Sequence, residues 1–250
     1  MRNLRMTLQY DGTEFSGWQT QPGFRTVQAI FEAAVQSVTQ VERMRANCSG
    51  RTDAGVHALG QVANFYTPTR LPCDVLVRAV NANLPDDLRV RDCDDVPQSF
   101  CANKDAVAKT YRYVIDDGRI QNPFARRYAF HCRKTLDVTA MQAAANALVG
   151  RHDFRSFETN WPNRLSSVRT ISRLTVERVN EFVQIEVTAD GFLYNMVRTI
   201  AGTLLQVGQG LWPVERVFEV LNAMDRRLAG PTAPPEGLFL LHVNYERVSV

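Results

Sequence analysis

The chain has 250 residues, 45% of them hydrophobic and 22% charged, which excludes a disordered protein and allows one large or two small domains. Its net charge of +3 is small for a nucleic-acid-binding protein, yet only three of its 29 basic residues are lysines. Arginine pairs with phosphate and stacks on bases, so this excess weakly favours RNA, although genome composition can produce the same bias. The five cysteines include no Cys-x-x-Cys pair, which predicts reduced thiols and no zinc site.

No apolar run approaches the roughly 18 residues that a membrane helix requires. The first residues enter an alternating segment rather than the apolar block of a signal peptide. We therefore expect a cytoplasmic protein without a membrane segment.

In the first half of the chain, apolar periodicity predicts the order strand, helix, strand, strand, helix, strand. Thr26 can cap the first helix, and Pro85 ends the second. The expected strands cover residues 4–10, 41–48, 56–66 and 88–96, and the expected second helix covers 74–83. This order is that of the split βαβ, ferredoxin-like arrangement, with an antiparallel sheet and both helices on one face.

The second half repeats this scheme with insertions. Its expected strands cover 106–115, 168–179, 182–188 and 238–245, its helices cover 137–149, 194–207 and 213–223, and long loops cover 116–134 and 151–166. Loops of that length are usually functional or mobile. We therefore predict an α+β protein of two ferredoxin-like halves with antiparallel sheets and helices packed on one face. The predicted domains are residues 1–103 and 104–250.

The loop between the second and third expected strands reads SGRTDAGVHA, residues 49–58. Gly50 and Gly55 can take positive φ, which lets the backbone approach a ligand closely while Asp53 points outward. Arg51, two residues earlier, could pair with Asp53 or contact phosphate. The alternative for Asp53 is an Asx-turn at the surface, beside an arginine without a function.

The same loop resembles the signature of the tRNA pseudouridine synthase A family. Further blocks resemble that family in the family's order: YDGTEFSGWQ at 10–19, TVQ at 26–28, KTYRY at 109–113, GFLYNMVR at 191–198 and APPEGL at 233–238. The resemblance therefore spans the chain, and the first block with the Asp53 loop lies in the first half.

The resemblance implies an isomerase that converts uridine to pseudouridine at positions 38 to 40 of the tRNA anticodon stem-loop, working as a homodimer. Asp53 would be the essential carboxylate, acting on ribose C1′ or uracil C6 or stabilising charge at the anomeric carbon. Tyr111 would contact the target base, and Arg198 would lie near the catalytic carboxylate. The reaction has no redox change, so we expect no cofactor and no metal.

Residue patterns alone leave alternatives open. Tyr111 and Tyr113 share one strand face and could be a buried aromatic pair, and Arg198 could be a helix-surface charge. Phe15, Trp18 and Arg25 could clamp RNA or seal the core; the rings suit either role. The rival function is a non-catalytic two-domain RNA-binding protein, although the aromatic signature of RNA-recognition modules is absent. A hydrolase that releases the base differs only in the fate of the intermediate.

Overall fold

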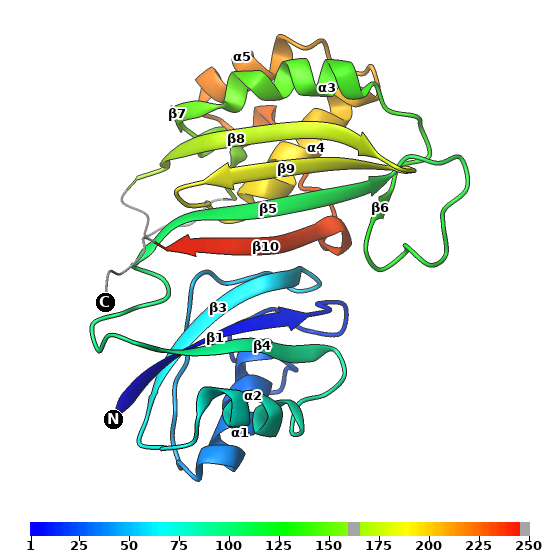
Figure 1. Cartoon of the computed structure of the whole chain (residues 1–250). Coiled ribbons are helices and arrows are strands. Elements are labelled where there is room, and N and C mark those ends of the chain that lie inside the picture. The colour runs from blue at the N-terminus through cyan, green and yellow to red at the C-terminus, as the bar shows by residue number, and fades with distance from the viewer. Residues whose placement is uncertain (160–165, 246–250) are drawn as a thin grey trace. The chain divides into compact units, whose positions relative to one another are not determined.

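The computed structural model describes residues 1–159 and 166–245. The chain forms two compact units, shown in Figure 1: unit 1 is Met1–Val107 with Phe239–Val250, and unit 2 is Ala108–Leu238. The chain therefore passes into unit 2 once and returns. A single division near residue 103 would instead assign the closing strand to the second half. Part of the long loop expected at 151–166 lies outside the described residues.

The expected helices and strands occur in the expected order, but two short strands, β6 and β7, lie at segments where long loops were expected. The strands are β1 (Arg2–Tyr10), β2 (Asn47–Cys48), β3 (His57–Thr67), β4 (Leu88–Val96), β5 (Ala106–Asp116), β6 (Phe130–His131), β7 (Gly150–Asp153), β8 (Val168–Val179), β9 (Phe182–Ala189) and β10 (Leu238–Tyr245). The helices are α1 (Val27–Thr39), α2 (Cys73–Asn81), α3 (Val138–Ala145), α4 (Met196–Gly208) and α5 (Arg216–Ala223). In the part of the chain that is described, no helix is both long and apolar enough to cross a bilayer.

The sheet of unit 1 has the order β4-β1-β3-β10, and the two-residue β2 also pairs with β3. Strand β1 is antiparallel to both β3 and β4. Strand β10 is parallel to β3, with Phe239 opposite His57. The prediction of a purely antiparallel sheet is therefore wrong, because the chain returns from unit 2 before it forms β10 and enters alongside β3.

The core of unit 1 lies between this sheet and helices α1 and α2, which pack against each other. Leu4, Met6 and Leu8 are fully buried, as the period-two pattern of β1 requires. Phe31 of α1 packs edge-on against Phe65 of β3, with ring centroids 6.0 Å apart. Burial of these apolar side chains is the main stabilisation of the unit.

Two local expectations in unit 1 need correction. The strand expected over 41–48 is reduced to β2, because side chains of α1 take the backbone groups before it: Glu32 accepts the Ala46 N–H at 2.8 Å, and Gln28 donates to the Ala46 carbonyl at 3.4 Å. Thr26 does occupy the N-cap of α1, but its side chain makes no capping bond. The helix start is instead bonded to the loop before it, because the N–H groups of Val27 and Gln28 donate to the carbonyls of Gly17 and Trp18.

Unit 2 contains the strand order β5-β9-β8-β7, antiparallel throughout. Its hairpin turns where predicted, with Asn180 in the left-handed region at φ 55°. The short β6 within the long 116–134 segment pairs parallel with β5, which again departs from a purely antiparallel sheet. Helix α3 packs against α4, α5 and β8. Tyr113 and Ile115 of β5 are fully buried.

Candidate active site

Asp53 lies in the loop between β2 and β3 and is half-buried. Backbone hydrogen bonds on both sides of it join this loop to the loop after β1. The Trp18 N–H donates to the Thr52 carbonyl at 3.0 Å, and the Gly55 N–H donates to the Phe15 carbonyl at 3.2 Å. The carboxylate is therefore carried by a loop whose backbone is fixed by a segment distant in sequence.

Gly17 is one of the points where the two loops approach each other closely. Its φ is +87°, and a Cβ built on it would lie 2.8 Å from the Thr52 carbonyl oxygen. Only glycine accommodates both the left-handed backbone and that approach. The Gly17 of the block at 10–19 is therefore a packing requirement of the Asp53 loop.

A buried polar network supports the residue before Asp53. The Tyr10 hydroxyl and the Thr52 Oγ1 lie 2.8 Å apart, and the Gln61 side-chain amide donates to the Tyr10 hydroxyl at 3.4 Å and to the Gly50 carbonyl at 2.8 Å. Ser49 Oγ donates to Gln61 Oε1 at 2.7 Å. Burial raises the pKa of Tyr10, so its hydroxyl stays neutral and keeps donating or accepting at physiological pH.

Sequence reasoning did not single out Thr52 or Gln61 as supports of the loop. The available signal was three polar residues, Ser49 and Thr52 before the expected strand over 56–66 and Gln61 within it, all of which are buried in the structure. Buried polar side chains need partners. Their positions alone do not reveal that the shared partner is Tyr10.

Arg51 has an exposed side chain. It forms no ion pair or hydrogen bond with the other side chains that the structure describes, Asp53 included.

Phe15 and Trp18 are 3% and 1% exposed. Of the two roles that the sequence left open for these rings, clamping RNA or sealing the core, the structure therefore supports sealing the core. Arg25 lies over the Phe15 ring, 4.1 Å from its centroid, and forms a bidentate pair with Asp87 at 2.9 Å. These contacts hold the loop after β1, and through it the backbone that carries Asp53.

His57 follows the Asp53 loop at the start of β3 and is 1% exposed. Its Nδ1 accepts the Gly12 N–H at 2.9 Å, and its ring stacks on Phe239 at 4.7 Å. An Nδ1 that accepts this bond carries no proton, so the Asp11 carboxylate 3.2 Å away is a close neighbour rather than its hydrogen-bond acceptor. His57 is thus a structural residue that joins the first loop to β3.

In unit 2, Tyr111 lies on β5 opposite Val187 of β9 and is 7% exposed. Its ring meets Phe192 edge-on, with centroids 5.0 Å apart. Tyr113, on the same face, is fully buried and donates its hydroxyl to the Pro234 carbonyl at 2.8 Å. The two tyrosines share a strand face as predicted, and Tyr113 belongs to the core.

Arg198 is a half-buried residue in the first turn of α4. Its Nε donates to the Ala233 carbonyl at 2.7 Å, and its Nη1 donates to Asn195 Oδ1 at 3.1 Å. The Ala233 N–H in turn donates to the Arg198 carbonyl at 3.0 Å. Arg198 therefore links the start of α4 to the APPEGL segment and is more than a charge on a helix surface.

The four predicted site residues divide between the units: Arg51 and Asp53 lie in unit 1, and Tyr111 and Arg198 lie in unit 2. Arg51 and Asp53 come from the 49–58 loop, and Tyr111 and Arg198 come from the blocks at 109–113 and 191–198. Within residues 1–159 and 166–245, no three His, Cys, Asp or Glu side chains are grouped so that they could hold a metal ion.

Comparison with known proteins covers nearly the whole chain. A relative from Brevibacillus brevis is 47% identical over 245 residues, one from Limosilactobacillus fermentum is 44% identical over 250, and one from Thermoanaerobacter sp. (strain X514) is 43% identical over 245. Each match covers 98% of this chain and at least 97% of the relative, and each relative is named tRNA pseudouridine synthase A. The tRNA pseudouridine synthase family model matches residues 6–104 and 144–246. The chain therefore belongs to the tRNA pseudouridine synthase family, isomerases that convert uridine in tRNA to pseudouridine.

Proposed function

We propose that Asp53 is the catalytic carboxylate of this isomerase. The observation that carries the proposal is the fixation of its loop by Trp18, Phe15 and the Tyr10 network, which holds one half-buried carboxylate in place. The reaction breaks the bond between uracil N1 and ribose C1′, turns the base, and joins C5 to C1′ with loss of the C5 proton. Atoms and electrons balance without a redox partner, and an ionised carboxylate suffices as nucleophile or as a stabiliser of positive charge.

The other site residues take roles that follow from their chemistry and from the family resemblance. Tyr111 would contact the target base, because an aromatic ring with a hydroxyl suits an extruded uracil. Arg198 would favour the ionised form of the catalytic carboxylate, as an arginine does for a nearby acid. Arg51 would contact an RNA phosphate, which its exposure supports.

We propose tRNA as the substrate, with uridines at positions 38 to 40 of the anticodon arm as the targets. The names of the relatives support tRNA, and the resemblance of the Asp53 loop supports the anticodon arm. The proposal includes a homodimer that binds one tRNA with both subunits, located in the cytoplasm where tRNA is used.

We further propose that both units are variants of the ferredoxin-like arrangement. In unit 1 the antiparallel order β4-β1-β3, with β2 on the far side of β3, supports this. In unit 2 the antiparallel order β5-β9-β8 supports it. As a separate proposal from the sequence, the domain that carries Asp53 is residues 1–103, and the domain that carries Tyr111 and Arg198 is residues 104–250.

The decisive experiment is incubation of the purified protein with unmodified tRNA, followed by pseudouridine mapping. Pseudouridine at positions 38 to 40 is the expected result, and modification elsewhere in the molecule would contradict the anticodon assignment. Free uracil in the reaction would indicate a hydrolase, and tight binding without any modified base would indicate the non-catalytic RNA-binding alternative. A matched transcript with cytidine at the three positions is the control.

A further inference from the structure

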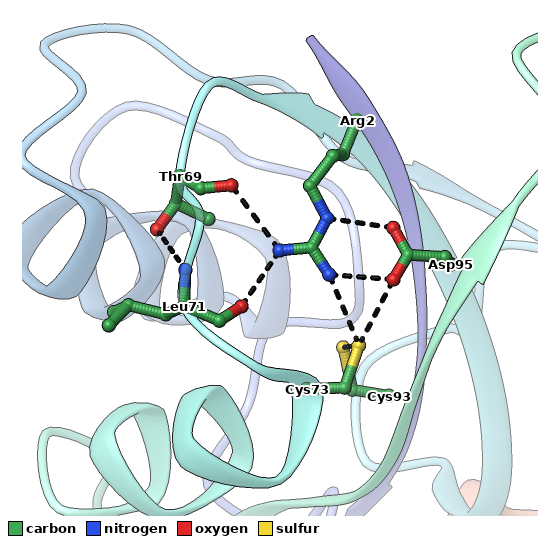
Figure 2. A network of polar contacts seen from close by, with 6 residues as sticks. All are labelled: Arg2, Thr69, Leu71, Cys73, Cys93 and Asp95. Carbon is green, nitrogen blue, oxygen red and sulfur yellow. Dashed lines mark hydrogen bonds and ion pairs between the residues drawn. The ribbon is translucent and has the colours of Figure 1, made fainter.

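Cys73 and Cys93 lie in contact in unit 1, away from the Asp53 loop in sequence. Cys73 is the first residue of α2, and Cys93 lies on β4, opposite Met6 of β1. The Cys93 thiol donates to the Cys73 sulfur, with the two sulfurs 3.1 Å apart. Both side chains are half-buried and neither is in a disulfide. Figure 2 shows the two sulfurs side by side beneath the guanidinium of Arg2.

Arg2 organises the surroundings of this pair. Its Nε and Nη2 form a bidentate pair with the Asp95 carboxylate at 2.7 and 2.6 Å, and its Nη1 donates to the Leu71 carbonyl at 2.7 Å, just before α2. Its Nη2 also lies 3.8 Å from the Cys73 sulfur (Figure 2). The guanidinium therefore fixes the start of α2 relative to β4 and faces the sulfur of Cys73.

The two sulfurs have different environments. Burial, and the neighbouring Cys73, raise the pKa of Cys93, so this thiol keeps its proton and can donate it. Cys73 accepts that S–H bond, and its sulfur faces the guanidinium of Arg2 at the start of a nine-residue helix. The Cys73 thiol in turn donates to Asp95 Oδ2 at 3.9 Å, and that carboxylate is also paired with Arg2.

From this geometry we propose that Cys73 and Cys93 are an oxidation site, a dithiol that hydroperoxides convert to an intramolecular disulfide. The Cys73 thiolate attacks a peroxide oxygen, the O–O bond breaks, and Cys73 becomes a sulfenic acid while hydroxide or alkoxide leaves and takes a proton. Cys93 then loses its proton and attacks the Cys73 sulfur. The S–S bond forms, the S–O bond breaks and water leaves. Two thiols and one hydroperoxide thus give one disulfide, one water and one alcohol or second water.

The disulfide would join the start of α2 to β4 and close a loop of about twenty residues in the unfolded chain. Sulfurs already in contact need only a small rotation to reach bonding distance. We therefore expect oxidation to raise the Tm of unfolding by roughly 6 to 12 °C, from the stabilisation typical of a loop of that size. A dithiol reductant would restore the original Tm.

The test uses the full-length protein, reduced, freed of reductant and treated with hydrogen peroxide at a few-fold excess. Remaining thiols are alkylated, and the disulfides are mapped by mass spectrometry. Trypsin releases Cys93 together with Cys101, because the nearest cleavage sites are Arg91 and Lys104, so a second cleavage before Asp94 is needed to separate them. The expected product is a Cys73–Cys93 bridge within one chain, with Cys48, Cys101 and Cys132 alkylated.

Single substitutions test which cysteine reacts first with peroxide and whether oxidation is specific to this pair. Cys93→Ser should accumulate a sulfenic acid at Cys73 that a dimedone probe labels, whereas Cys73→Ser should not give one at Cys93. Arg2→Ala should slow bridge formation several-fold, while Arg5→Ala, which removes the neighbouring pair with Asp94, should leave the rate within twofold. Cys48→Ser is the matched control and should bridge like the unmodified protein.

Several results would overturn the proposal. Alkylation of both Cys73 and Cys93 after peroxide treatment would show that the contact is not redox-active. A bridge to another cysteine, or between two chains, would assign the chemistry to a different pair. An unchanged or lower Tm in the bridged protein would show that the disulfide strains the fold rather than fitting it.

Discussion

The Asp53 loop of unit 1 and the elements that carry Tyr111 and Arg198 in unit 2 position side chains by different means. Asp53 depends on single contacts from a distant loop, among them the Trp18 N–H bond to Thr52 and the close approach of Gly17. Tyr111 lies within a ladder of eight register pairs between β5 and β9. A loop held by a few contacts is sensitive to each of them, whereas a strand distributes the same constraint over many bonds.

The sharpest test of this comparison is the carboxylate itself. Asp53→Asn should lower turnover at least about 10⁴-fold, as loss of a catalytic nucleophile does, because an amide is neutral and a poor nucleophile. Binding of tRNA should stay within a few-fold, since phosphate contacts supply most of the affinity. Single-turnover pseudouridine formation and a binding titration measure the two effects.

Asp92→Asn is the matched control, because Asp92 is an exposed aspartate on β4 of the same unit. It should change neither turnover nor binding. Substantial turnover in a folded Asp53→Asn protein would remove Asp53 from the chemistry and leave its loop as a structural feature.

Most elements of this fold could be predicted from apolar periodicity. The strand over 88–96 and the hairpin turning at 180–181 agree with β4, β8 and β9, because alternation and turn residues are local signals. The parallel pairing of β10 with β3 could not be predicted, because it joins segments about 180 residues apart and leaves no mark on either pattern. The strand expected over 41–48 failed for a related reason: side chains of α1, rather than a strand, take its backbone groups.

The site was predictable in a similar, partial way. Glycines on either side of Asp53 and the resemblance of the blocks singled out Asp53, Arg51, Tyr111 and Arg198. The roles of these four residues remain predictions. The supports of the Asp53 loop were not visible, because Tyr10, Thr52 and Gln61 meet only after β1 and β3 pair. Sequence identifies a reactive group more readily than the side chains that hold it.

The next largest effect is expected from the contact between the loops. Gly17→Ala adds a Cβ 2.8 Å from the Thr52 carbonyl and forces a left-handed alanine. We expect a loss of about 1 to 3 kcal/mol in the free energy of unfolding and a fall in turnover of roughly 10². Gly23→Ala is the matched control, since it has φ +80° but nothing within 4 Å of the added Cβ.

Equal turnover in the two glycine variants would show that backbone strain alone matters, and that the approach to Thr52 does not position Asp53.

In unit 2 the corresponding change is Thr188→Val, which removes the hydroxyl contact with Thr110 at 2.9 Å between β5 and β9. It should lower turnover less than threefold, because the ladder remains intact. A large loss there would contradict the proposed difference between the two regions.

Two substitutions of Tyr111 distinguish a residue that contacts the target base from one that only packs in the core. Tyr111→Leu removes the ring and the hydroxyl and should weaken tRNA binding by roughly 10-fold, from the usual 1 to 3 kcal/mol of a stacked base. Tyr111→Phe keeps the ring beside Phe192 and should bind normally. Slow turnover with normal binding in Tyr111→Phe would give the hydroxyl a chemical role, and equal behaviour of all three proteins, measured by binding and turnover, would leave Tyr111 as a core residue.

The smallest effect is expected at Arg51, whose exposed guanidinium contrasts with the half-buried Arg198. Arg51→Ala should weaken tRNA binding several-fold and lower the slope of log affinity against log salt by about one, with saturated turnover unchanged. Arg198→Ala should do the reverse, lowering turnover more than affinity, because its bonds to Ala233 and Asn195 fix the start of α4. Arg43→Ala, at another exposed arginine of unit 1, controls for the general loss of one positive charge. A turnover defect in Arg51→Ala at saturating tRNA would move that residue from the phosphate contacts to the chemistry of Asp53, because phosphate contacts alone bind substrate without changing the rate of the bound complex.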